Sequence, residues 1–275
     1  MTDPRRLLVR DGVASSVLEG VVPAERYLAP DAMTARRALA LRAEPVPRAE
    51  QRDTILVGEV FDVLETARGW AFGQARRDGY VGWVERDGLA PGTAAPTHRV
   101  AAVRSVALAE PGARAAGLVT LSLNALVRVG ATRDRFAEAE GLGWIAAGHL
   151  SPIGWFETDP AAVAERFIGS PYLWGGRGAE GIDCSGLVQA ALLACGRGCP
   201  RDSDQQAGLG IAASADDLRR GDLVCWPGHI GIMADETRLI HASGIQMAVV
   251  VEPLADAVAA RKAVGSPTDF RRVWP

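Results

Sequence analysis

The chain has 275 residues, of which 48% are hydrophobic and 23% are charged, a composition typical of a globular protein with an adequate core. Its formal net charge of −3 gives no basic surface on average, which argues against nucleic acid or an anionic membrane as a partner. This length allows one large domain or two to three small ones.

The beginning of the chain does not resemble a signal peptide. Its first apolar run has only three residues, Leu7 to Val9, and Asp11 closes it before a signal-peptide core could form. No stretch approaches the ~18 uninterrupted apolar residues of a membrane helix. We therefore expect a cytoplasmic protein with no membrane partner, and we expect it to be a monomer.

The cysteines are expected to be free thiols, as is usual in a reducing compartment. The spacing between Cys195 and Cys199 is weak evidence for zinc, because no second pair accompanies it. We expect neither a metal nor an organic cofactor.

Residues 1–30 hold two short apolar runs and are predicted to form an arm that packs onto a neighbouring domain. In residues 31–92, short apolar runs at 54–57, 60–64, 70–72 and 80–84 are separated by turns rich in glycine. Several short strands at close spacing predict a small closed barrel. This succession, ending in Gly-Tyr-Val-Gly-Trp-Val at 79–84, resembles a bacterial SH3 domain, and residues 91–96 have the composition of a linker.

The pattern recurs more faintly in residues 97–152. The segments 126–129, 135–139 and 141–145 echo the strands at 60–64, 70–72 and 79–84 of the preceding domain. Such an internal duplication predicts a second SH3-like barrel.

The last region, residues 153–275, begins with a helix predicted over 159–168, followed by a segment rich in glycine that runs into Cys184. Apolar residues then recur at helical spacing, which places Cys184 at a helix N-terminus with Asp183 as N-cap and Gly196 as C-cap. The helix dipole there favours an anion, so we expect the pKa of this thiol to be lowered. By itself, Cys184 could equally be a small buried hydrophobic residue.

Two of the four histidines follow this cysteine on predicted strands. His229 begins the run His-Ile-Gly-Ile-Met, and His241 ends Arg-Leu-Ile-His. A thiolate at a helix start, an imidazole on an adjacent strand and a second polar group to orient it form the arrangement that nucleophilic thiol catalysis needs.

The segments Tyr-Leu-Trp-Gly-Gly, Asp-Cys-Ser-Gly-Leu-Val, Arg-Gly-Asp-Leu-Val, Gly-His-Ile-Gly-Ile and Ile-His-Ala-Ser resemble, in this order, the NlpC/P60 family of papain-like cysteine peptidases. Members of this family cleave peptidoglycan stem peptides. The resemblance covers residues 153–275 and implies an α+β papain-like catalytic domain preceded by two small all-β SH3-like barrels. It also implies that Cys184 is the nucleophile, that His229 is the general base and acid, and that His241 orients His229.

The resemblance further implies a set of substrate-binding residues. The Arg-Asp-Ser segment at 201–203 matches the segment that receives a free N-terminal L-alanine, and the first SH3 domain lends a tyrosine and an acidic residue. Carboxylates there would compensate the buried ammonium group of the substrate. The tyrosine at 172 is a candidate oxyanion donor, and three further residues flank the cysteine. The full set is Tyr172, Trp174, Asp183, Ser185, Arg201, Asp202, Ser203, Tyr80 and Asp53, with Glu50 as the alternative to Asp53.

The expected activity is hydrolysis of the γ-D-glutamyl–diamino acid bond in short cell-wall peptides with a free N-terminal L-alanine, releasing L-Ala-D-Glu. The partner would be a small murein peptide. Two alternatives stay open, an inactive module that binds wall peptides and another amidase or acyltransferase on the same fold. The sequence leaves undecided which diamino acid is preferred, and whether the peptides are recycled or foreign.

Overall fold

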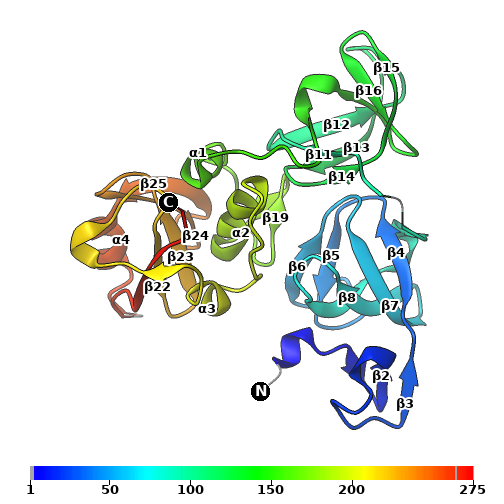
Figure 1. The fold of residues 1–275 in the computed structure, drawn as a ribbon, viewed down its shortest axis with the longest axis horizontal. Helices are drawn as coiled ribbons and strands as arrows, with labels where there is room; N and C mark the ends of the chain where they lie inside the picture. Colours follow the sequence, from blue (N-terminus) through cyan, green and yellow to red (C-terminus); the bar gives the residue numbers. More distant parts are fainter. Residues whose placement is uncertain (1–2, 94, 264, 275) are drawn as a thin grey trace. The chain divides into compact units, whose positions relative to one another are not determined.

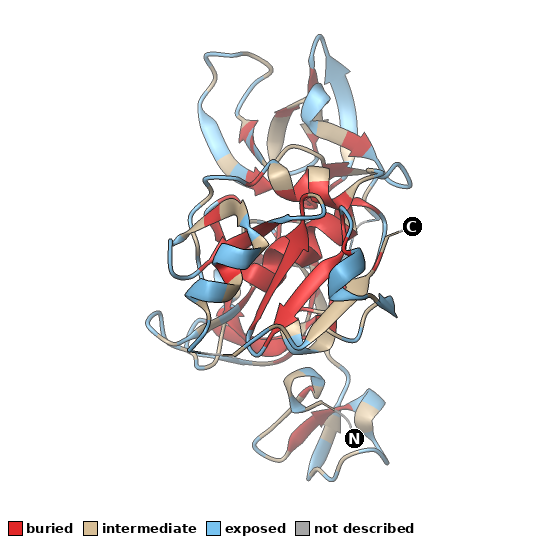
Figure 2. Cartoon of the chain, turned by 90° about the vertical axis from the view of Figure 1, so that its left-hand side faces the viewer, coloured by how far each residue is buried: buried red, intermediate tan, exposed pale blue. Residues whose placement is uncertain are grey.

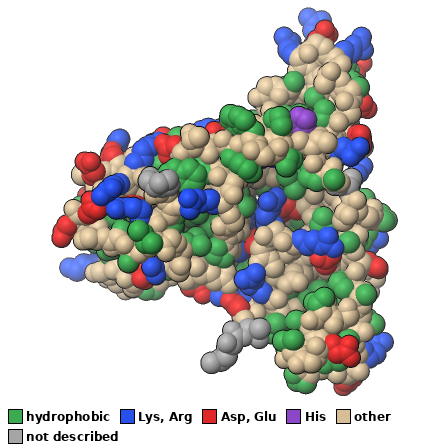
Figure 3. Space-filling model, viewed as in Figure 1, with side chains coloured by type: hydrophobic (Ala, Val, Ile, Leu, Met, Phe, Trp, Pro, Cys, Tyr) green, Lys and Arg blue, Asp and Glu red, His purple; other side chains and the backbone are tan. Residues whose placement is uncertain are grey.

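The computed structural model describes residues 3–93, 95–263 and 265–274. The chain forms two compact units, residues 1–153 and residues 154–275, which we call the N-terminal and C-terminal units (Figure 1). Charged side chains of both signs are interspersed on the face drawn in Figure 3, consistent with the small net charge. In the described part of the chain, no helix combines the length and apolar character needed to cross a membrane.

The N-terminal unit begins with a small three-stranded sheet. Its elements are η1 (Pro4–Arg6), β1 (Val9–Arg10), β2 (Val13–Ser15), η2 (Ser16–Leu18) and β3 (Arg26–Leu28). Leu8 and Val13 share a buried cluster with Trp70 and Trp83 of the following domain, and the Arg10 guanidinium lies 4.6 Å from the centre of the Trp83 ring. The predicted arm thus packs against its neighbour through apolar contacts.

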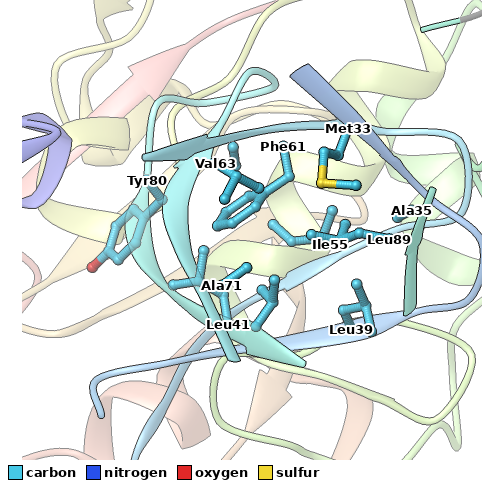
Figure 4. Packing of buried hydrophobic residues seen from close by; sticks show 12 residues of the cluster. Met33, Ala35, Leu39, Leu41, Ile55, Phe61, Val63, Ala71, Tyr80 and Leu89 are labelled. Atoms are coloured by element: carbon cyan, nitrogen blue, oxygen red, sulfur yellow. The ribbon is translucent and has the colours of Figure 1, made fainter. Parts of the chain in front are cut away.

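The next region forms one seven-stranded sheet, in the order β10-β4-β7-β8-β9-β5-β6. The runs predicted at 60–64, 70–72 and 80–84 are β7, β8 and β9. Alternate side chains of these strands point inward and build a core around Phe61, with the Tyr80 ring at its side and the hydroxyl directed away (Figure 4). The bounds are β4 (Asp31–Ala35), β5 (Leu39–Arg42), β6 (Gln51–Ile55), β7 (Val60–Ala67), β8 (Trp70–Ala75), β9 (Val81–Glu85), η3 (Arg86–Gly88) and β10 (Leu89–Pro91).

The rest of the N-terminal unit consists of a three-stranded sheet, β14-β11-β18, and a five-stranded sheet, β13-β12-β17-β16-β15. Both contribute to a core around Leu121 and Ile145. Gly58 has a φ of +79°, and a Cβ there would overlap the Leu126 carbonyl oxygen, so only glycine fits. The bounds are β11 (His98–Val100), β12 (Arg104–Leu108), β13 (Gly117–Ser122), β14 (Leu126–Val127), β15 (Val129–Arg133), β16 (Phe136–Ala139), β17 (Gly143–Ala146), η4 (Ala147–His149) and β18 (Leu150–Pro152).

The C-terminal unit is built on a six-stranded sheet, in the order β21-β26-β22-β23-β24-β25. Its central strands β22 and β23 are buried along their whole length, and Figure 2 draws this sheet largely in red. Helix α2 packs on β23 and β24, while α4 packs on β24 and β25. The strands are β19 (Arg177–Gly178), β20 (Gly181–Ile182), β21 (Ile211–Ala212), β22 (Leu223–Trp226), β23 (His229–Met233), β24 (Arg238–Ser243), β25 (Ala248–Pro253) and β26 (Asp269–Arg272). The helices are α1 (Pro160–Glu165), α2 (Cys184–Ala194), α3 (Ser203–Gln206), η5 (Ala215–Asp217) and α4 (Leu254–Ala260).

Two helix ends differ from the sequence predictions. Helix α1 ends at Glu165, three residues before the predicted end. The C-cap of α2 is Cys195, and Gly196 follows it with a φ of +77°, the left-handed conformation that glycine supplies just past a helix. The predicted N-cap of α2 is confirmed, because the Asp183 side chain accepts a hydrogen bond from the Gly186 N–H group.

Candidate active site

Cys184 is the first residue of α2, and Asp183 holds the helix start against the glycine-rich segment before it. Asp183 Oδ1 accepts a hydrogen bond from the Gly186 N–H group at 2.7 Å, and Oδ2 accepts one from the Gly175 N–H group at 2.8 Å. A Cβ at Gly186 would overlap the Gly176 carbonyl oxygen. The glycines therefore let the two backbone segments approach each other closely and fix the position of the cysteine.

A buried ion pair supports the same helix start. Arg201 is only 1% exposed, and its guanidinium donates to Asp183 Oδ2 at 2.6 Å, to Asp183 Oδ1 at 3.1 Å and to Ser185 Oγ at 2.8 Å. Gln206 Nε2 donates to the Ser185 carbonyl oxygen at 2.9 Å. These contacts indicate that Arg201, Asp183 and Ser185 position the cysteine. Their predicted contact with substrate stays a prediction.

His229, His241 and Glu252 form a hydrogen-bonded series on three adjacent strands. His229 Nε2 lies 2.9 Å from His241 Nδ1, and His241 Nε2 lies 2.7 Å from Glu252 Oε1. The register pairs Leu239 with Glu252, which places the glutamate diagonally opposite His241 on the same face of the sheet. Gln246 Nε2 donates to the other oxygen of Glu252 at 3.0 Å.

This series fixes the tautomers of both rings. A carboxylate can only accept, so His241 must donate from Nε2, which leaves its Nδ1 as an acceptor. His229 then donates from Nε2 to that acceptor, and its Nδ1 keeps a lone pair. Nδ1 of His229 is therefore the nitrogen that can take a proton.

The thiol of Cys184 lies beside the start of β23, the strand that begins with His229. The Ile230 N–H group hydrogen-bonds the sulfur. Burial, together with the Asp183 charge, raises the pKa of the Cys184 thiol to about 12. The expectation of a lowered pKa is wrong, because desolvation and the neighbouring carboxylate outweigh the helix N-terminus, the Arg201 charge and the hydrogen bonds to the sulfur.

Both histidines are neutral. Burial and the positive charge of Arg261 lower the pKa of His229 to about 2. Burial also lowers the pKa of His241, although Glu252 opposes this shift. The resting site therefore holds a neutral thiol next to a neutral imidazole.

Tyr172 and Trp174 belong to the segment that precedes the cysteine. The Tyr172 N–H group donates to the Met247 carbonyl oxygen at 3.0 Å, and its ring lies next to Gly244. Burial raises the pKa of the Tyr172 hydroxyl, and the nearby Cys184 adds to this shift, so the hydroxyl stays protonated and can donate. The side chain of Trp174 is 56% exposed.

The Arg-Asp-Ser segment leads into α3. Asp202 is the N-cap residue of this helix and makes no side-chain capping bond, and Ser203 is its first residue. Both Asp202 and Ser203 are partly exposed, as a contact with substrate requires.

Tyr80 and Asp53 lie in the N-terminal unit. Tyr80 belongs to the buried core cluster of its sheet, Asp53 is fully buried on β6, and Glu50 is exposed just before β6. Their contribution to substrate binding stays a prediction.

Two charged residues of the site were missed by the sequence analysis, Glu252 and Arg261. Glu252 directly follows the run Val249 to Val251, so the sequence did show an acidic residue at the end of an apolar run. Its partner could not be read, because the strand register decides which face it occupies. Among the described residues, no group of three or more histidine, cysteine or acidic side chains is placed to hold a metal ion.

Comparison with known proteins yields two family matches. Residues 169–266 match the NlpC/P60 family, and residues 41–89 match the bacterial dipeptidyl-peptidase SH3 domain. The second predicted SH3-like domain stays a prediction.

Curated relatives are similar to this chain over segments of 89 to 100 residues. Dipeptidyl-peptidase 6 of Lysinibacillus sphaericus is 37% identical over 89 residues, which are 32% of this chain and 33% of that protein. The γ-D-glutamyl-L-lysine dipeptidyl-peptidase of Bacillus subtilis is 30% identical over 100 residues, 34% of each protein. The chain thus matches about a third of the length of these relatives.

A solved structure of an NlpC/P60 family protein from Bacillus cereus superimposes with a TM-score of 0.76 at 17% identity, covering 89% of this chain and all of that one. At this identity the likeness shows the fold. The predicted fold class, a papain-like domain after SH3-like β structure, is confirmed. With Cys184 at the start of α2 and two histidines on the facing strands, the chain contains an NlpC/P60 family domain preceded by a bacterial SH3 domain.

Proposed function

We propose that the protein is a cysteine endopeptidase that hydrolyses the γ-D-glutamyl–diamino acid bond of short cell-wall peptides with a free N-terminal L-alanine. The observation that carries this proposal is the series His229, His241 and Glu252 beside a thiol at a helix start. The names of the relatives, dipeptidyl-peptidases that include one for γ-D-glutamyl-L-lysine, support the substrate class. The product L-Ala-D-Glu fits a role in murein peptide recycling.

The reaction begins from the neutral pair. As the Cys184 sulfur attacks the γ-carbonyl carbon, Nδ1 of His229 takes the thiol proton, a carbon–sulfur bond forms and the carbonyl π electrons move to oxygen. We assign the Cys184 N–H group at the helix start and the Tyr172 hydroxyl as the donors to this oxyanion. Proton transfer coupled to attack avoids a resting thiolate, which burial disfavours.

Collapse of the tetrahedral intermediate breaks the carbon–nitrogen bond. His229 gives its proton to the leaving amine, and the acyl group stays on the sulfur as a thioester. His229 then takes a proton from water, whose oxygen attacks the thioester and releases the carboxylic acid and the thiol. Glu252 and His241 hold His229 in the tautomer that both steps need.

The free N-terminus of the substrate carries a positive charge that must be compensated in a cleft. Asp202, the partly exposed N-cap residue of α3, is the carboxylate of the C-terminal unit that we assign to this ammonium group. An acetylated N-terminus lacks the charge and would be a poor substrate.

The test uses the purified protein with L-Ala-γ-D-Glu-meso-diaminopimelate and with its N-acetylated form, and follows products by mass spectrometry. We expect L-Ala-D-Glu from the free peptide only, no product with Cys184→Ala, and normal activity with Cys225→Ala, a control that removes a buried thiol on β22. Absence of cleavage of both peptides would refute the peptidase. Equal cleavage of both would refute recognition of the free amine.

A further inference from the structure

Arg261 brings a cation to the catalytic groups from a part of the chain that the sequence analysis did not use. It is the C-cap residue of α4, which packs on β24 and β25, the strands of His241 and Glu252. Its guanidinium interacts electrostatically with Cys184 and Tyr172 as well as with the two histidines and the glutamate. The α4 C-terminus therefore faces the reacting groups.

The buried part of the Arg261 guanidinium contains a hydrogen-bond donor without an acceptor among the described residues. Its Nη2 atom is inaccessible to solvent and has no hydrogen-bond acceptor among the described residues. Glu252 does not fill this role, because no hydrogen bond joins it to this nitrogen, and its two oxygens accept from His241 and from Gln246. Arg201, a second arginine near the cysteine, donates to Asp183 and Ser185.

A buried guanidinium N–H group without an acceptor is costly, and structures retain one where a ligand supplies the acceptor. The matching ligand is a carboxylate, because guanidinium binds it through parallel hydrogen bonds that are strong in a site of low dielectric constant. We propose that Arg261 binds a carboxylate of the peptide substrate next to the scissile amide, an inference that rests on the proposed function. Arg261 is then a specificity-determining residue.

The proposed tripeptide substrate carries three such carboxylates. One is the α-carboxylate of the γ-linked D-glutamyl residue, on the acyl side of the scissile bond. The other two lie on the leaving side, and they are the side-chain carboxylate of meso-diaminopimelate, which lysine lacks, and the C-terminal α-carboxylate of the diamino acid. All three present the same chemistry to Arg261, and substrates that lack one of them identify which is bound.

The experiment compares Arg261→Gln with Lys262→Gln, which removes an exposed positive charge from the adjacent position. Each variant is assayed on the meso-diaminopimelate peptide, on its D-isoglutamine form, on its L-lysine form and on its form with an amidated C-terminal α-carboxylate. We expect Arg261→Gln to lower kcat/KM on the first peptide by about 10- to 100-fold, mainly through KM, as for a lost hydrogen bond to a charged group. Lys262→Gln should leave it unchanged.

The effect of Arg261→Gln should vanish on the peptide that lacks the bound carboxylate. An equal loss on all four peptides would overturn the proposal, since it would mean that Arg261 only supports the sulfur or oxyanion charge. No loss on any peptide would overturn it as well.

A binding measurement separates this inference from the proposed function. Calorimetric titration of Cys184→Ala with the meso-diaminopimelate peptide needs no turnover, and adding Arg261→Gln should weaken binding by a similar factor. If the wild-type protein cleaved nothing, the peptidase would fail, whereas unchanged affinity in this titration would refute the role of Arg261.

Discussion

At the scale of single residues, the tautomer of His229 depends on a carboxylate two hydrogen bonds away. Glu252 accepts from His241, and only this direction leaves Nδ1 of His229 free to take the thiol proton. A glutamine at 252 can present either an acceptor or a donor, so the direction of the whole series would no longer be fixed.

We therefore expect Glu252→Gln to lower kcat by about 10- to 100-fold while KM changes little, because the general base is then in the wrong tautomer for part of the time. Steady-state kinetics on the free peptide measure this. Glu236→Gln, which neutralises an exposed acid in the turn after β23, is the matched control and should behave as wild type. A rise in KM at constant kcat would instead mean that Glu252 serves binding.

The raised pKa of Cys184 leads to a second prediction at this scale. With a thiol pKa of about 12, the thiolate is scarce at neutral pH and grows as pH rises toward that value. The rate of alkylation by iodoacetamide, taken as the difference between wild type and Cys184→Ala, should climb steadily from pH 7 to pH 10. A plateau already reached near pH 6 would show a resting thiolate–imidazolium pair and contradict the neutral site.

Sequence reasoning identified residue types and missed their environments. Cys184, His229 and His241 were named from the sequence pattern and the family resemblance, and the structure gathers them beside the start of α2. The pKa of the thiol was predicted in the wrong direction, because burial depends on what packs over the helix start and no local pattern reveals that.

At the scale of elements, the start of α2 is held by groups from three segments, and Arg201 forms a buried ion pair with the Asp183 carboxylate. Removing one member of a buried ion pair leaves the other charge uncompensated, which is more costly than losing a pair at the surface.

Arg201→Met should therefore lower the free energy of unfolding by about 3–5 kcal/mol. Urea unfolding of the full chain, followed by circular dichroism, measures this. The control is Arg219→Met, which breaks the exposed pair with Asp217 and should change little. A small effect of Arg201→Met would show that the pair is not needed to hold the helix start.

Strand identity was predicted better than strand register. Apolar runs at 60–64, 70–72 and 80–84 became β7, β8 and β9, because short runs of β-branched and aromatic residues between turns favour strands. The neighbours of each strand in the sheet depend on long-range pairing. Glu252 and Arg261 joined the site through that pairing and through the packing of α4, so neither was predicted.

At the scale of the whole molecule, the two compact units meet in the sequence between Ile153 and Gly154, one residue from the boundary predicted after Pro152. In the sequence, the strand pattern of residues 97–152 is followed by a helix whose N-cap is Asp159, and this change indicated the boundary. The residues just after the boundary are irregular, and Trp155 and Phe156 are 56% and 44% exposed.

Exposed irregular segments between compact units are preferred sites of proteolysis. Chymotrypsin cleaves after aromatic residues, so brief digestion of the native protein should cut first after Trp155 or Phe156, as identified by N-terminal sequencing of the fragments. Trypsin is the control, because the chain has no lysine or arginine between Arg135 and Arg166, and it should not release a fragment that begins in this segment. First cuts by chymotrypsin inside either unit would show that residues 153–156 are protected, and the boundary would have to be placed elsewhere.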